Sequence, residues 1–83
     1  MTNNIAMLRA KHGLTQQAFG EKVGMHTHAV GYAERNHCTV KLAKKTADVL
    51  GENVFSVLGA DALKLIPKTP EDKEILIKTI KEL

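Results

Sequence analysis

The side chains best able to bind a metal ion lie close together in the chain. His26, His28, His37 and Cys38 all fall between positions 26 and 38, and imidazole and thiolate are ligands that zinc prefers. Residues one or two positions apart on a helix point in different directions, however, so this spacing does not direct four ligands at one ion. The sequence therefore predicts no metal site and no cofactor.

A catalytic site is not expected either. Ser56 is the only serine, and the sequence holds no glycine-rich loop of the kind that binds phosphate. Cys38 is the single cysteine, so it has no partner for an internal disulfide. We expect Cys38 to be a passive loop or core residue, with thiol sensing as the alternative. These features argue against an enzyme.

The distribution of charge points instead to a polyanionic partner. The formal net charge of +3 belongs to residues 1–59, where seven Lys and Arg face four acidic residues, while residues 60–83 hold five lysines and five acids. All four histidines also lie in the first part. A basic, histidine-rich part followed by a neutral one is typical of a module that faces nucleic acid and carries an attached element of another purpose.

The size and composition of the chain set the scale of the fold that carries these residues. Its 83 residues allow one small domain. Aromatic residues make up 4% of the chain, so an aliphatic core, and with it a helical fold, is favoured. No apolar run approaches the roughly 18 residues of a membrane span, and the polar N-terminus does not resemble a signal peptide. We therefore expect a cytoplasmic protein, and a domain this small favours association with a partner chain.

Capping residues and apolar spacing predict an all-α fold. The first expected helix begins after Asn3 or Asn4 and stops near Gly13. The next four cover residues 16–23, capped by Thr15, then residues 27–35, residues 40–50, capped by Thr39, and residues 54–58, capped by Asn53. The last expected helix begins at Thr69 and Pro70. Asn36 is expected to close the third helix in the left-handed conformation. Residues 60–68 are ambiguous, because Leu63, Lys64 and Leu65 alternate like a short strand while Pro67 blocks continuation of a helix, and we expect them to form a linker.

A run of residues in the second and third expected helices carries a resemblance to a known family. The run is TQQAFGEKVG at residues 15–24, followed by Val30 six positions after its last glycine and then by Glu34 and Arg35. It resembles the Cro/CI-type (XRE-like) helix-turn-helix domain of phage repressors and related bacterial regulators. The resemblance implies a five-helix lambda-repressor-like DNA-binding bundle over residues 1–59. The linker and additional C-terminal helix expected over residues 60–83 are not part of the family's common domain.

The resemblance also implies a function and a set of site residues. The function is that of a sequence-specific double-stranded DNA-binding transcriptional regulator, a repressor that acts as a homodimer with a recognition helix at about residues 27–35 in the major groove. The residues expected to read bases are Thr27, His28 and Tyr32. Phosphate contacts are expected from Gln16, Gln17, His26, Arg35, Lys41 and Lys44. Arg9 and Glu34 are expected to form a structural ion pair. His26 stands where the family usually has a Ser or Thr that caps the recognition helix.

The C-terminal segment allows two interpretations. Its apolar residues Leu76, Ile80 and Leu83, with Leu63 and Leu65, would form or support a homodimer interface, because paired half-sites require a two-fold protein. Alternatively, the terminal helix packs back on the bundle and covers the fifth helix. A functional alternative of another class is a protein-interaction module, antirepressor-like or antitoxin-like, whose helical domain or tail binds another protein.

Overall fold

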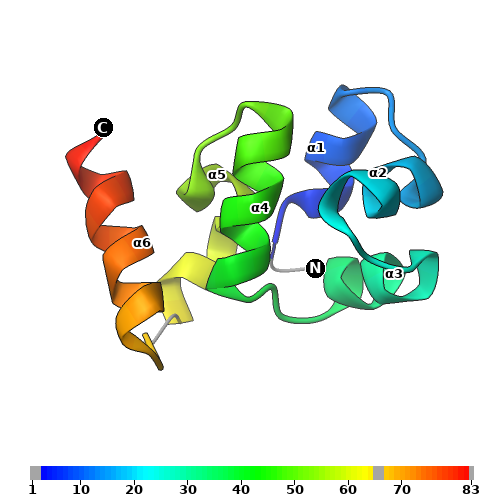
Figure 1. Ribbon diagram of the computed structural model, residues 1–83. Helices are drawn as coiled ribbons and strands as arrows, with labels where there is room; N and C mark the ends of the chain where they lie inside the picture. Colours follow the sequence, from blue (N-terminus) through cyan, green and yellow to red (C-terminus); the bar gives the residue numbers. More distant parts are fainter. Residues whose placement is uncertain (1–2, 65–66, 83) are drawn as a thin grey trace.

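A computed structural model describes residues 3–64 and 67–82. Every secondary-structure element within these residues is a helix, and short turns and loops connect the helices. The all-α class is therefore confirmed. The elements are α1 (Ile5–Lys11), α2 (Gln16–Val23), α3 (Thr27–Arg35), α4 (Val40–Leu50), α5 (Val54–Leu58), the 3-10 helix η1 (Gly59–Lys64) and α6 (Pro70–Lys81) (Figure 1). Within the described ranges, no helix has both the length and the apolar character needed to cross a membrane.

Side-chain caps fix where three of the helices begin, as the sequence predicts. The hydroxyls of Thr15, Thr39 and Thr69 each accept a hydrogen bond from the backbone N–H three residues later, at 3.0 to 3.1 Å. Such a bond satisfies one of the amides that a helix start leaves without an internal partner. α2 and α4 end at Gly24 and Gly51, whose φ angles of 74° and 68° are left-handed.

One local expectation, the backbone conformation of Asn36, is wrong. The backbone of Asn36 is extended, with φ −124° and ψ −155°, rather than left-handed. Asn36 closes the last turn with two donors, because its backbone N–H and its side-chain Nδ2 both donate to the carbonyl of Tyr32, at 3.0 and 2.9 Å. The predicted linker begins with η1, which is held in place by the buried Asp61, whose Oδ2 accepts from the backbone N–H of Cys38 at 3.2 Å. Leu65 lies outside the described residues.

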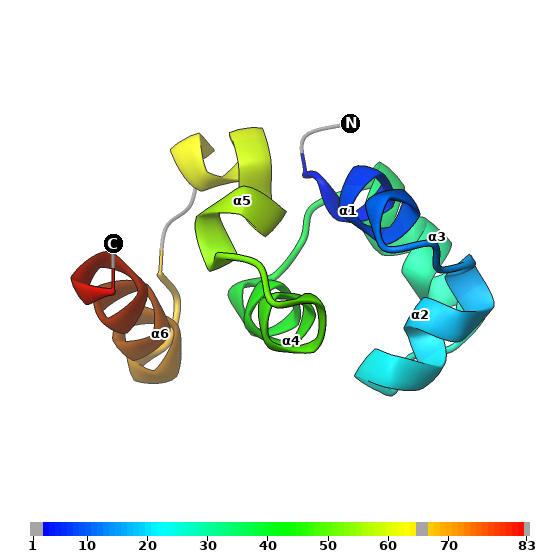
Figure 2. The same ribbon diagram turned by 90° about the horizontal axis from the view of Figure 1, so that it is seen from above.

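The core is aliphatic apart from Phe19 and Cys38, and Phe19 is its largest fully buried side chain. Every helix from α1 to α5 contributes to it, through residues that include Ile5, Phe19, Val30, Ala43 and Val57. Met25 and Phe55 are partly buried against this cluster. Figure 2 shows α4 between the α2–α3 pair on one side and α6 on the other, so α4 links the two parts of the molecule.

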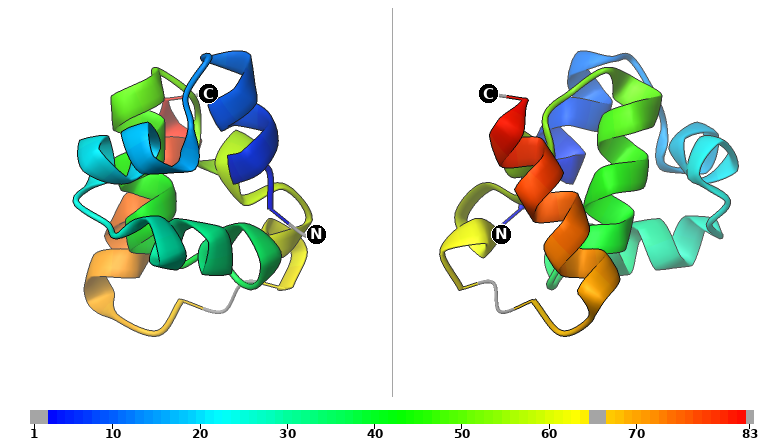
Figure 3. Two further views of the ribbon diagram at one scale, coloured as in Figure 1. Left: turned by 90° about the vertical axis from the view of Figure 1, so that its right-hand side faces the viewer. Right: turned by 60° about the vertical axis from the view of Figure 1, so that its left-hand side comes forward.

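The C-terminal helix packs on the bundle. α6 lies against α4 and α5 (Figure 3), and Ile75 reaches the core cluster while Thr79 is buried. The other apolar side chains of α6 differ in solvent exposure. Leu76 is half-buried, whereas Ile80 is 57% exposed. The side chain of Leu63 in η1 is 89% exposed. Leu83, the third residue of the predicted dimer interface, lies outside the described residues.

Candidate nucleic-acid interface

The turn between α2 and α3 is short and closely packed. The backbone N–H of Met25 donates to the carbonyl of Gly20 at 2.8 Å, and Gly24 takes the left-handed conformation. A Cβ atom added to Gly20 would collide with the backbone oxygen of Met25. Glycine at position 20 therefore allows the start of α3 to fold closely onto α2.

A buried carboxylate fixes the inner face of α3. Glu34 Oε2 accepts from Arg9 Nε of α1 at 2.7 Å, and Glu34 Oε1 accepts from Gln16 Nε2 of α2 at 2.9 Å. Arg9 Nη1 also donates to the carbonyl of Leu14 at 2.9 Å. The structure thus brings Arg9 and Glu34 together in an ion pair and adds Gln16, which the sequence analysis assigned to a phosphate, as a third member.

The outer face of α3 carries the residues predicted to read bases. Tyr32 is 63% exposed, His28 is exposed and Thr27 is half-buried. His28 and Tyr32 are four residues apart, so they lie on the same face of the helix. Their polar groups are therefore presented together to solvent, on a helix whose opposite face is held by Glu34.

His26 caps α3 in place of the usual hydroxyl residue. Its ring Nδ1 accepts a hydrogen bond from the backbone N–H of His28 at 3.2 Å. The rings of His26 and His28 stack, with centroids 5.2 Å apart and planes 7° apart. Because Nδ1 is used by the cap, Nε2 is the ring nitrogen of His26 that is left to contact a phosphate.

Gly31 lies beneath two of the predicted phosphate-binding side chains. A Cβ atom at this position would lie 3.2 Å from Arg35 Nη1 and 3.5 Å from Gln16 Nε2. The space beside this glycine is therefore occupied by side chains of the protein itself. Gln16 and Arg35, which come from different helices, converge there, and Gln17 is exposed in the first turn of α2.

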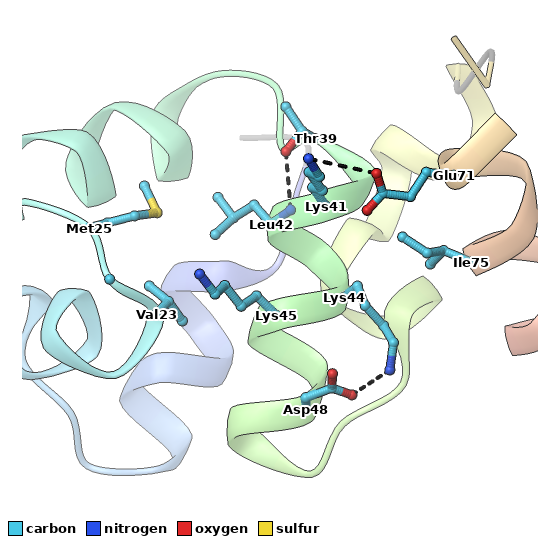
Figure 4. A pocket seen from close by; sticks show the side chains of 11 residues that line it. Val23, Met25, Thr39, Lys41, Leu42, Lys44, Lys45, Asp48, Glu71 and Ile75 are labelled. Atoms are coloured by element: carbon cyan, nitrogen blue, oxygen red, sulfur yellow. Dashed lines mark hydrogen bonds and ion pairs between the residues drawn. The ribbon is translucent and has the colours of Figure 1, made fainter. Parts of the chain in front are cut away.

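The two predicted phosphate-binding lysines belong to a different part of the surface. Lys41 Nζ lies 3.7 Å from Glu71 Oε2 of α6, and Lys44 Nζ lies 2.6 Å from Asp48 Oδ1. Both line a groove bordered by the α2–α3 turn, α4 and α6 (Figure 4). The structure therefore groups these lysines with α6 and not with the exposed side chains of α3.

Asn3 is a positioning residue that sequence reasoning missed. Its Nδ2 donates to the carbonyls of Ala33 and Asn36 at 2.8 and 3.0 Å, and its Oδ1 accepts from the backbone N–H of Ile5 at 3.1 Å. The side chain thus starts α1 and also fixes the C-terminal end of α3. The sequence signal for Asn3 was its position just before a predicted helix, which suits an N-cap. Its contact with α3 could not be predicted, because that contact depends on packing between distant segments.

Cys38 lies in the connection between α3 and α4. It is buried, and its Sγ donates to the carbonyl of Thr39 at 3.3 Å. Burial, and secondarily the negative charge of Asp61, raise the pKa of the Cys38 thiol from 9.0 to about 12. The thiol therefore stays protonated at neutral pH, which favours a passive role over thiol sensing.

Comparison of the chain with models of known families, with curated proteins and with solved structures finds no match.

Proposed function

We propose that this protein is a bacterial or phage sequence-specific double-stranded DNA-binding transcriptional regulator, a repressor that acts as a homodimer in the cytoplasm. Helices α1 to α5 would correspond to the five-helix repressor-like bundle that the sequence resembles, and α6 to the additional C-terminal helix. In this proposal α3 enters the major groove and α2 crosses the backbone.

The observation that carries the proposal is the contrast between the two faces of α3. The inner face is fixed by Glu34, and its C-terminal end is fixed by Asn3. The outer face leaves His28 and Tyr32 exposed. A helix held in this way can present hydrogen-bonding groups at a constant height and angle, as reading of base edges requires.

The chemistry of the outer face suits direct readout. The His28 ring can donate to N7 or O6 of guanine, and the Tyr32 hydroxyl can donate or accept. Thr27 can hydrogen-bond to any base or place its methyl group against thymine. None of these side chains forms the bidentate contact of an arginine with guanine, so we expect each one to contribute modestly to discrimination.

Phosphate contacts would flank this face. Arg35, Gln17 and Nε2 of His26 lie at or near the ends of α2 and α3, where side-chain donors and helix N-termini suit an anion. Lys41 and Lys44 remain candidates, although each would first have to exchange a carboxylate partner for a phosphate. Contacts of this kind give affinity that does not depend on sequence.

Homodimerisation would use the exposed apolar side chains of α6. Ile77 and Ile80 are 53% and 57% exposed, and Leu76 is half-buried beside them. We expect Ile80→Glu to convert a dimer to a monomer in size-exclusion chromatography with light scattering, while Lys78→Glu on the same helix does not. A wild-type protein that is monomeric at all concentrations would rule out this interface.

Selection of bound sites from random DNA, followed by gel-shift titration, tests the DNA-binding proposal. We expect Tyr32→Ala and His28→Ala to reduce the ratio of specific to non-specific affinity, and Lys44→Ala to weaken both about equally. The affinity should also fall steeply with salt as bound phosphates release counterions. Failure to observe saturable binding to any duplex at about 50 mM salt would favour the protein-interaction alternative.

A further inference from the structure

A groove with an apolar floor crosses α4 between the α2–α3 turn and α6. The groove is open to solvent, and its volume is about 530 Å³. Val23 and Met25 lie on one side, Leu42 lies on α4, and Ile75 of α6 lies on the other side (Figure 4). None of the three side chains predicted to read bases lines this groove, so it is separate from the outer face of α3.

Three lysines surround the apolar floor, and they differ in how firmly they are held. Lys44 is paired with Asp48 at 2.6 Å. The pair between Lys41 and Glu71 is longer, 3.7 Å, and its side chains are 72% and 58% exposed, so it is weak and easily exchanged. Lys45 forms no ion pair with any residue that the structure describes.

We propose that this groove binds an acidic, amphipathic peptide segment of a partner protein. Apolar side chains of the segment would pack on Leu42 and Ile75, which are partly buried, and Met25 can adapt its flexible side chain to their shape. One carboxylate would pair with Lys45, and a second would pair with Lys41 by displacing Glu71. The site thus matches both the apolar and the charged side of such a segment.

The composition of the groove favours a peptide over a nucleic-acid backbone. A phosphate backbone carries closely spaced charges and would be repelled by Asp48 and Glu71, which line the same groove. The apolar floor would also gain nothing from phosphates. A peptide can place one carboxylate next to Lys45, which has no acidic partner among the described residues, and a second next to Lys41 in the place of Glu71.

The proposal goes beyond DNA binding but affects it through shared residues. Lys41 and Lys44 line the groove and are also candidates for phosphate contact. If both interactions exist, a bound peptide would compete with DNA for these lysines. The test below contains no DNA, so its result does not depend on whether the protein binds an operator.

Fluorescence anisotropy with a labelled model peptide tests the groove. The probe has leucines at i, i+3, i+4 and i+7 and glutamates on the remaining positions, and a control peptide has lysine at every glutamate position. We expect saturable binding of the acidic peptide and none of the basic one. Lys45→Glu should weaken binding about three- to ten-fold, because it replaces an attractive charge with a repulsive one. The matched control Lys22→Glu, on the exposed surface of α2 outside the groove, should leave it unchanged.

Backbone amide NMR shifts locate the bound peptide independently of the variants. We expect the largest shifts at Val23, Leu42 and Ile75. Equal binding of the acidic and basic peptides would overturn the proposal, as would equal loss of affinity in the two lysine variants. Shifts confined to Ile77 and Ile80 would overturn it too, because they would place the peptide on the outer surface of α6.

Discussion

Glu34 of α3 accepts a hydrogen bond from Arg9 of α1, with 2.7 Å between Nε and Oε2, and only 6% of the Glu34 side chain is exposed. The pair joins two helices that are far apart in the sequence. The Arg9 side chain is 20% exposed, so the guanidinium retains some contact with water whereas the carboxylate has little. Removal of the arginine therefore leaves a nearly buried negative charge without its cation.

We expect Arg9→Met to lower the free energy of unfolding by about 3 kcal/mol, since an uncompensated buried charge is costly. The double variant Arg9→Met with Glu34→Met should lose less than the sum of the two single losses. Urea unfolding monitored by circular dichroism measures these changes. Lys11→Ala is the control, because the Lys11 side chain is 64% exposed and its pair with Glu52 should contribute little to stability. Additive losses in the double variant would contradict the interpretation.

Two glycines in neighbouring helices should respond in opposite ways to alanine. Gly20→Ala places a Cβ atom against the backbone oxygen of Met25, which cannot move without opening the turn, so we expect a loss of about 1–3 kcal/mol of stability. Gly31→Ala places its Cβ atom only against the ends of the Arg35 and Gln16 side chains. Because alanine is favoured over glycine inside a helix by about 1 kcal/mol, we expect this variant to gain stability. Thermal unfolding of both variants tests this contrast, and equal destabilisation would contradict it.

The capping role of His26 can be separated from a role in binding. His26→Ala removes the acceptor for the backbone N–H of His28 and should cost about 1 kcal/mol of stability. His26→Ser restores a side-chain acceptor and should recover most of this loss. Gln17→Ala serves as the control, because the Gln17 side chain is exposed in the first turn of α2. If the serine variant is as unstable as the alanine variant, the hydrogen bond does not stabilise the helix.

The Cys38 thiol should make stability depend on alkaline pH. Its pKa is about 12 in the folded protein against an ordinary 9.0, because burial and the charge of Asp61 disfavour the thiolate. The unfolded chain therefore loses this proton first as the pH rises. The contribution to stability is complete below about pH 9 and is lost between about pH 9 and 12.

Urea unfolding at several pH values, with Cys38→Ala as the reference, measures this contribution. Between about pH 8 and 10 the wild-type protein should lose more stability than the alanine variant, because only the wild type has the thiol. In the native protein the thiol should also react slowly with a disulfide reagent, and it should react quickly in urea. Equal reaction rates in native and unfolded protein would show that the thiol is accessible.

The helices could be predicted from the sequence because their ends are set by local chemistry. Thr15, Thr39 and Thr69 accept hydrogen bonds from amides only three residues away, and Gly24 and Gly51 close the helices that precede them. These interactions depend on neighbours in the chain, so the sequence pattern contains them. Asn36 was the exception. Its backbone is extended, and its side chain adds a second hydrogen bond to the carbonyl of Tyr32 beside the one from its backbone N–H.

The candidate site was less predictable, since its geometry depends on partners from other helices. Nothing in the sequence near Gln16 indicates that its amide donates to Glu34, 18 residues later. Lys41 likewise meets Glu71 of α6, which lies outside the segment that resembles the known family. Tertiary packing therefore decides which polar side chains are available to a ligand. Only the structure shows which side chains these are.

The contacts of the two asparagines before α1 bear on the order in which the chain assembles during synthesis. Asn3 binds the carbonyls of Ala33 and Asn36, while the backbone N–H of Asn4 donates to Val57 and its side chain donates to Ser56. The residues that precede α1 thus find their last partners more than fifty positions later in the chain. Contacts of such long range form late. We therefore expect the start of α1 to remain undocked on the nascent chain until α5 has emerged.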